Sequence, residues 1–231
     1  MTELLSLLNL ASVGIFGIVL SAAFCDITWT RRRKALLVVS TFLMLAFQGV
    51  VSLYWGTWTA RYLYPFITHL PLFLLLAFMT RELLWPLVAV LTAYLCCQLR
   101  RWAALLVIAL FPAGGTVLQD ATELLVTLPI LLALIRWIAP SVRALSHSSL
   151  ALQLQFGVIP LLSYVFDYLT RIYTNLLSSG NQAAVEFMPF VCSLAYLAFV
   201  LQTTQQQQLR TQLEQTRNSL NLQVAQAVRE I

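Results

Sequence analysis

The chain has 231 residues, of which 60% are hydrophobic and 10% are charged, and its formal net charge is +5. A soluble domain carries about 25% charged residues and needs polar cover, so this composition excludes an ordinary soluble globular protein. A charge at the bilayer centre is costly, so spanning segments are nearly free of charge. The composition, with a mean hydropathy of +0.81, therefore predicts an all-α, polytopic transmembrane helix bundle.

The first two predicted spans flank a basic run. Residues 4–24 are apolar over a length that crosses a bilayer, and no basic segment precedes them, so they predict a membrane helix and not a signal peptide. Arg31, Arg32, Arg33 and Lys34, the 31–34 basic run, follow this span and are typical of a cytoplasmic loop. Residues 35–55 form the second span. Because the positive charge clusters in this way, it does not indicate nucleic-acid binding.

Aromatic residues follow the second span. Trp55, Trp58 and Tyr62 lie in a cluster typical of the headgroup level of a membrane, and they are candidates for sensing a signal there. Residues 63–99 come next, and Arg81 and Glu82 divide them into two short apolar pieces that resemble a helical hairpin.

Four further apolar segments complete the membrane part. They cover residues 102–118, with a break at 112–115, and then residues 124–139, 150–177 and 185–202. We therefore assign residues 1–202 to a transmembrane sensor bundle.

The distribution of basic residues predicts the topology. In the C-terminal half, Arg100 and Arg101, the loop containing Arg136 and Arg143, and the tail after residue 202 are placed inside, and residues 114–123 outside. The 31–34 basic run places the N-terminus outside. The orientations predicted for the N-terminal and C-terminal halves of the chain agree only if residues 63–99 cross the membrane an odd number of times. A helical hairpin would cross it twice. We predict seven spans with the N-terminus outside and a cytoplasmic C-terminus; eight spans are the alternative.

The tail, residues 203–231, is polar and contains neither Gly nor Pro. Apolar residues recur in a heptad pattern with one stutter, which predicts a cytoplasmic coiled-coil-like helix and a parallel homodimer. The candidate relay and dimerisation residues are Leu209, Leu213, Leu220 and Val224. A solvated amphipathic tail is the alternative. The pattern ends without a cap, so we expect either further protein or a fragment.

Ionisable residues within apolar segments are candidates for function. Asp167 and Arg171 are spaced to pair on one helix face, either as a structural ion pair or as a sensor of a ligand or ion. Asp120 and Glu123 form either an acidic extracellular turn or a carboxylate pair that does acid/base work or binds a cation, and both are candidates for sensing a signal. His69 is expected to be a hydrogen-bonded interior residue. No pattern predicts a catalytic residue, a metal site or a cofactor, and the cysteines fit apolar packing.

Two segments carry a resemblance to a known family. The first is Tyr64-Pro65-Phe66-Ile67-Thr68-His69-Leu70-Pro71, and the second is Ala93-Tyr94-Leu95-Cys96-Cys97-Gln98-Leu99-Arg100-Arg101-Trp102. They resemble the membrane sensor region of GHKL-type histidine kinases from Gram-positive bacteria, relatives of the Agr/Com peptide-pheromone receptors.

The resemblance implies the sensor portion of a two-component signal-transduction system in a bacterial plasma membrane. An extracellular peptide or small molecule would be the ligand. ATP, Mg and the response regulator would bind only to a kinase domain outside this chain. This chain itself contains no histidine after Val200. The alternative function is a small ion-coupled transporter or permease that uses Asp167, Arg171 and His69 at a midplane site.

Overall fold

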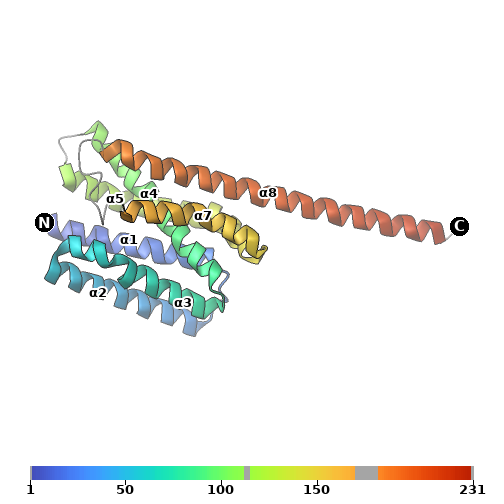
Figure 1. Cartoon of the computed structure of the whole chain (residues 1–231), viewed down its shortest axis with the longest axis horizontal. Helices are drawn as coiled ribbons and strands as arrows, with labels where there is room; N and C mark the ends of the chain where they lie inside the picture. Colours follow the sequence, from blue (N-terminus) through green and yellow to red (C-terminus); the bar gives the residue numbers. More distant parts are fainter. Residues whose placement is uncertain (1, 112–114, 170–181, 230–231) are drawn as a thin grey trace.

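The computed structural model describes residues 2–111, 115–169 and 182–229, and within these ranges the regular structure is helical, with no strand. The elements are α1 (Thr2–Phe24), α2 (Arg31–Tyr64), η1 (Pro65–His69), α3 (Leu70–Thr80), α4 (Leu84–Leu110), α5 (Gly115–Ala133), η3 (Leu134–Ile138), α6 (Ala139–Ala144), η4 (Leu145–His147), α7 (Leu150–Asp167) and α8 (Gln182–Arg229). They form a helix bundle from which α8 projects (Figure 1).

Six helical segments of the described chain are long and apolar enough to cross a membrane. These are Leu4–Phe24, Arg31–Gly56, Trp58–Thr80, Leu84–Leu110, Val117–His147 and Leu150–Asp167. The result confirms a multi-pass, all-helical membrane protein. The span predicted over residues 185–202 lies within α8, and the total of seven spans stays a prediction.

A glycine divides α2 into two spans. Gly56 has φ 86° and ψ 159°, a conformation that L-residues with a side chain rarely adopt. The chain reverses direction at this position (Figure 1). Val51 on the first limb packs with Ala60 and Ile67 on the second, so the hairpin has an apolar seam of its own. Trp55 and Trp58 flank the turn.

The structure corrects the predicted boundaries around Arg100. Helix α4 runs without interruption from Leu84 to Leu110, so residues 102–118 are not a separate span and Arg100 does not lie in a cytoplasmic loop. The side chain of Arg100 is buried and ion-paired with Glu123, so it has no need of water at a helix end.

The predicted outside loop 114–123 is also wrong. Helix α5 begins at Gly115, and Asp120 and Glu123 lie inside it. The helix continues through η3, α6 and η4 as the span Val117–His147, which is much longer than the predicted segment 124–139.

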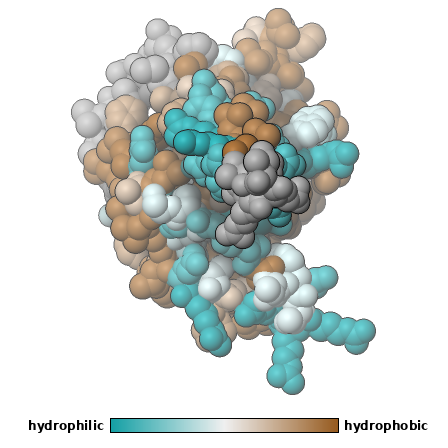
Figure 2. Space-filling model, turned by 90° about the vertical axis from the view of Figure 1, so that its right-hand side faces the viewer, coloured by the Kyte–Doolittle hydropathy of each residue, from teal (hydrophilic) through white to brown (hydrophobic). Residues whose placement is uncertain are grey.

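The orientations predicted for the N-terminal and C-terminal halves no longer conflict, because Arg100 does not mark a cytoplasmic loop. Consecutive candidate spans run antiparallel, so the connections at residues 25–30, 81–83 and 148–149 share one end of the bundle (Figure 1). Helix α8 projects beyond that end (Figure 1). The 31–34 basic run begins at the same end, whereas Arg100 lies in the half of α4 that is distant from it. Figure 2 shows hydrophilic residues on α8 and this end of the bundle, and hydrophobic residues on the flanks.

Polar contacts fasten the helices at this end. Trp85 Nε1 on α4 donates to the carbonyl oxygen of Phe24 at 3.0 Å. Arg143 Nη2 donates to the carbonyl oxygen of Ala23 at 2.9 Å. Both acceptors belong to the last turn of α1, whose carbonyls have no partner within the helix, so these bonds cap α1. Cys25, directly after α1, is fully buried, and this burial raises the pKa of its thiol to about 12.

We predict that Cys25 resists alkylation. In a variant with Cys96, Cys97 and Cys192 replaced by alanine, maleimide at pH 8 should modify Cys25 more than about 100-fold more slowly than a free exposed thiol, because both burial and the raised pKa suppress the thiolate. A cysteine introduced at the exposed position Leu213 is the control. Mass spectrometry measures both rates in nanodiscs, and equal rates would contradict the packing of this end.

Candidate functional site

A buried polar network joins α1, α4 and α5 in the half of the bundle distant from the projecting part of α8. Its members, here called the Arg100 network, are Asn9, Ser12, Arg100, Asp120, Glu123 and Thr127. Each helix contributes at least one polar side chain. The network therefore fixes the relative position of three helices by directional bonds and not by apolar packing alone.

Arg100 is the centre of this network. Its Nη2 donates to Glu123 Oε2 and to Asn9 Oδ1, each at 2.8 Å. Its Nη1 donates to Ser12 Oγ at 3.0 Å and to Thr127 Oγ1 at 2.8 Å. The Arg100 and Glu123 side chains are only 3% and 9% exposed. A guanidinium in this setting is stable only with such a full set of acceptors.

Asn9 connects the ion pair to a second carboxylate. Its Nδ2 donates to Asp120 Oδ1 at 2.8 Å and to Glu123 Oε2 at 2.9 Å. Glu123 Oε2 thus accepts from both Arg100 and Asn9, whereas Asp120 is half-buried. Asp120 is the most accessible carboxylate of the network, and Asn9 links it to Glu123. A change in the charge of Asp120 would therefore alter the surroundings of the buried ion pair.

A second cluster, here called the tyrosine–histidine cluster, lies between α2, η1, α4 and α7. It consists of Tyr64, His69, Tyr94, Tyr164 and Tyr168. His69 Nδ1 lies 2.9 Å from Tyr164 Oη. The ring centroids of Tyr94 and Tyr164 are 4.8 Å apart, and those of Tyr164 and Tyr168 are 4.7 Å apart. The rings therefore form one contiguous polar and aromatic contact.

The hydroxyl of Tyr94 donates to Asp167 Oδ2. Asp167 is 6% exposed, so this carboxylate is held inside the bundle by the tyrosine. The bond joins α4 to the end of α7.

A π-helical turn brings two members of the cluster together. Residues five apart in an α-helix point about 140° away from each other. The wider turn Pro65–His69 lets Tyr64 and His69 share a face, and their ring centroids are 4.8 Å apart. Such turns are frequent at functional sites.

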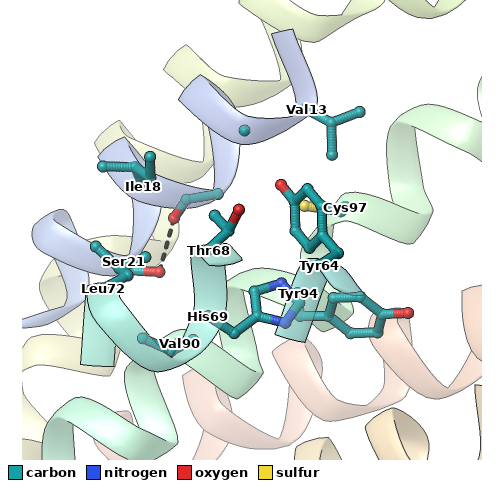
Figure 3. A pocket seen from close by; sticks show the side chains of 12 residues that line it. Val13, Ile18, Ser21, Tyr64, Thr68, His69, Leu72, Val90, Tyr94 and Cys97 are labelled. Carbon is teal, nitrogen blue, oxygen red and sulfur yellow. Dashed lines mark hydrogen bonds between the residues drawn. The ribbon is translucent and has the colours of Figure 1, made fainter. Parts of the chain in front are cut away.

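A pocket of about 50 Å³ adjoins the cluster. Figure 3 shows Tyr64, Thr68 and His69 around it, on one side, with Val13 and Ile18 of α1 on another. Cys97 and Tyr94 of α4 also line it. Cys97 lies three residues before Arg100 on α4, so the pocket is within one helical turn of the Arg100 network as well.

The predicted site residues fall into three groups. Asp120 and Glu123 join the Arg100 network, and Asp167 binds Tyr94 of the tyrosine–histidine cluster. The predicted acidic extracellular turn is wrong, because its two carboxylates lie in α5. The three aromatic candidates lie on the exposed surface of the membrane hairpin: Trp55, Trp58 and Tyr62.

Two further predictions concern His69 and Arg171. His69 is an interior residue with a hydrogen bond, as predicted. Arg171 lies outside the described residues, so its pairing with Asp167 stays a prediction.

Sequence reasoning missed Arg100 and Asn9. Arg100 was assigned to a loop because it stands next to Arg101, although a lone arginine within an apolar run also indicates a buried ion pair. Asn9 carries no charge and gives no signal in a single sequence.

The described residues contain no group of three or more His, Cys, Asp or Glu side chains that could hold a metal ion. No family model, curated protein or solved structure matches the chain. The arrangement of the polar groups therefore provides the basis for a functional proposal.

We predict a strong coupling between Arg100 and Glu123. Replacing Arg100 with Met leaves a buried carboxylate unpaired and should destabilise the protein by about 3–5 kcal/mol. The double variant Arg100→Met, Glu123→Leu should lose much less than the sum of the single losses. Unfolding in mixed micelles measures all three, with the exposed Arg32→Gln as control. Additive losses would contradict a buried ion pair.

Proposed function

We propose that this chain is the membrane sensor portion of a two-component histidine kinase of the GHKL type, which relays an extracellular signal to a cytoplasmic pair of helices. The observation that supports this proposal is the single helix α8. It spans 48 residues, starts against the bundle and continues outside it (Figure 1). A transporter has no need of such an extension.

The first part of α8 is packed against α4. Ser193 Oγ donates to the carbonyl oxygen of Leu95 at 2.9 Å, and Tyr196 Oη lies 3.3 Å from Thr92 Oγ1. Nearer the start of α8, the ring of Phe190 stacks on Trp102, with centroids 4.6 Å apart. Val200 is fully buried, which extends the packed region along the helix.

The second part of α8 leaves the bundle. After Thr204, nearly every described side chain is exposed or half-buried. At 1.5 Å per residue, the helix from residue 205 to 229 is about 37 Å long. Rotation or translation of the packed part would therefore be carried through the exposed part, because the backbone hydrogen bonds are continuous.

Helix α4 provides the mechanical link between the polar groups and α8. Arg100 and Tyr94 hold the Arg100 network and the tyrosine–histidine cluster. Thr92, Leu95 and Trp102 of the same helix contact α8. A signal that changes the packing of either cluster must therefore displace the surface on which α8 lies. A ligand drives this change only by its differential affinity for the two packings.

The relay residues form an unpaired apolar stripe in the chain. Leu209, Leu213, Leu220 and Val224 are 59%, 68%, 55% and 62% exposed, respectively. In the proposed parallel homodimer, a second copy covers this stripe in a coiled coil.

Charge supports the proposed orientation. Helix α8 projects at the end where the 31–34 basic run begins, and basic residues concentrate on the cytoplasmic side. In the proposed orientation, residues 203–231 lie in the cytoplasm of a bacterial cell and the N-terminus lies outside, with seven spans. The Arg100 network and Asp167 then lie toward the extracellular side, where a peptide or small molecule would act. ATP, Mg and the response regulator belong to a kinase domain outside this chain.

We predict that disulfide crosslinking follows the stripe. In membranes containing cysteine-free protein, single cysteines at Leu213 and Leu220 should form dimers at least about fivefold faster than cysteines at Thr211 and Asn218, which lie on the opposite face. Changing both Leu213 and Leu220 to Lys should abolish association of the tails. Equal crosslinking at all four positions, or unchanged association of the lysine variant, would refute the dimer.

The relay itself is tested by a distant substitution. Asp120→Asn removes the charge of the most accessible carboxylate of the Arg100 network, and it should change the crosslinking rate of a cysteine at Leu213 by at least about threefold. The matched substitution Arg32→Gln should leave the rate unchanged. A relay through α4 is refuted if the Asp120 variant crosslinks at the wild-type rate.

A second candidate, an ion-coupled permease, is favoured by one observation. His69 belongs to the tyrosine–histidine cluster, and Asp167 accepts a hydrogen bond from Tyr94 of the same cluster. Two titratable groups therefore lie close together inside the bundle. Proteoliposomes with an internal pH-sensitive dye distinguish the candidates. A receptor gives no more proton flux than protein-free liposomes, whereas a flux that disappears in Asp167→Asn would indicate a permease.

A further inference from the structure

Three buried polar atoms without partners lie in or next to the wall of the pocket between α1, α2, η1 and α4. Thr68 Oγ1 has no hydrogen-bond partner, and neither does the Nε2 or the Oε1 of Gln48. Both side chains are 2% exposed. A buried polar atom without a hydrogen bond destabilises the folded state, so three such atoms indicate a partner that satisfies them.

Thr68 belongs to the pocket wall, and Gln48 lies behind that wall, next to Gly14. Thr68 lines the pocket, as does Gly14 of α1. A Cβ atom placed on Gly14 would lie 3.8 Å from Gln48 Oε1 and 3.6 Å from Tyr64 Oη, so both of these oxygens lie beside the pocket wall. The Tyr64 hydroxyl also lies near Thr68, although the two side chains do not reach hydrogen-bond geometry. Figure 3 shows Tyr64 and Thr68 facing the space beside α1.

We propose that this pocket is a binding site for a small cluster of internal water molecules, held by Gln48, Thr68 and Tyr64. The groups that need partners are the Gln48 amide and the Thr68 hydroxyl, which offer both donors and acceptors. Water can pair with both kinds of group, whereas a cation would be repelled by the amide N–H₂. This inference is independent of the proposed receptor function.

The volume argues for the same occupant. A cavity holds one water from about 10–15 Å³, while a dry cavity that binds benzene measures about 150 Å³. The pocket of about 50 Å³ fits a few waters. An apolar guest would leave the Gln48 amide and the Thr68 hydroxyl unsatisfied.

Such water would extend the hydrogen bonding of the tyrosine–histidine cluster. Gln48 lies on the first limb of α2, and Thr68 lies on η1 next to His69. Bridging waters are nearly as favourable as direct bonds. The water site therefore ties the α2 hairpin to the turn that holds His69, where apolar packing alone would leave polar gaps.

Two glycines provide a matched pair of variants. A Cβ atom on Gly17 or on Gly49 would meet no atom within 4 Å. Of these two glycines, Gly17 lines the pocket and Gly49 does not. Gly17→Leu should therefore fill the pocket and displace water, whereas Gly49→Leu adds the same side chain to α2 outside it.

X-ray radiolytic footprinting in nanodiscs measures the bound water, because radicals formed from it oxidise the adjacent side chains. Tyr64 lines the pocket and is half-buried, so its own oxidation rate is compared between variants. Gly17→Leu should lower Tyr64 oxidation at least about fivefold relative to the wild type, and Gly49→Leu should leave it unchanged.

A second variant keeps the test decisive if Gly17→Leu fails to fold. Gln48→Met with Thr68→Val removes the polar partners at similar volume, and it should lower Tyr64 oxidation in the same way. The proposal is overturned if folded Gly17→Leu, or the folded double variant, retains the wild-type rate of Tyr64 oxidation. It is also overturned if native mass spectrometry finds a lipid or another organic molecule that Gly17→Leu displaces.

Discussion

The buried charge of Arg100 is the interaction on which the rest of the structure depends. A guanidinium inside a membrane bundle must be neutralised and hydrogen-bonded, because isolated charges there are strongly unfavourable. Glu123, Asn9, Ser12 and Thr127 meet this requirement from α1 and α5. The register of three helices is therefore set by one side chain, and any change in its partners forces these helices to repack together.

The same helix that carries this charge supports α8. Tyr94, two turns before Arg100, reaches Asp167 on α7, and Thr92 and Leu95 reach α8. Polar contacts of this kind have few alternative geometries, unlike apolar packing, which tolerates small slides. The bundle thus concentrates its directional bonds on α4, which makes this helix suited to pass a local change to the projecting part of α8.

The sequence predicted the class of the fold well, because run length and charge depletion follow directly from the bilayer. It failed where a local feature had two physical meanings. Arg100 and Arg101 fit a cytoplasmic loop by charge, but Arg100 is buried by a partner 23 residues away. The end of the second span at residue 55 was predicted correctly, but the following span starts at Trp58, just after the positive φ of Gly56, and not at residue 63. The tyrosine–histidine cluster needs the π-helical turn, which no pattern in the sequence indicates.

Hydrogen–deuterium exchange in nanodiscs provides the most direct test of the central claim, that the Arg100 network controls α8 through α4. Glu123→Gln removes the charge that Arg100 requires, at almost unchanged volume. The account predicts faster amide exchange in α1, α4 and α5, and also along residues 190–204 of α8, where Ser193 and Tyr196 contact α4. Faster exchange confined to α1, α4 and α5, with residues 190–204 at wild-type rates, would contradict it.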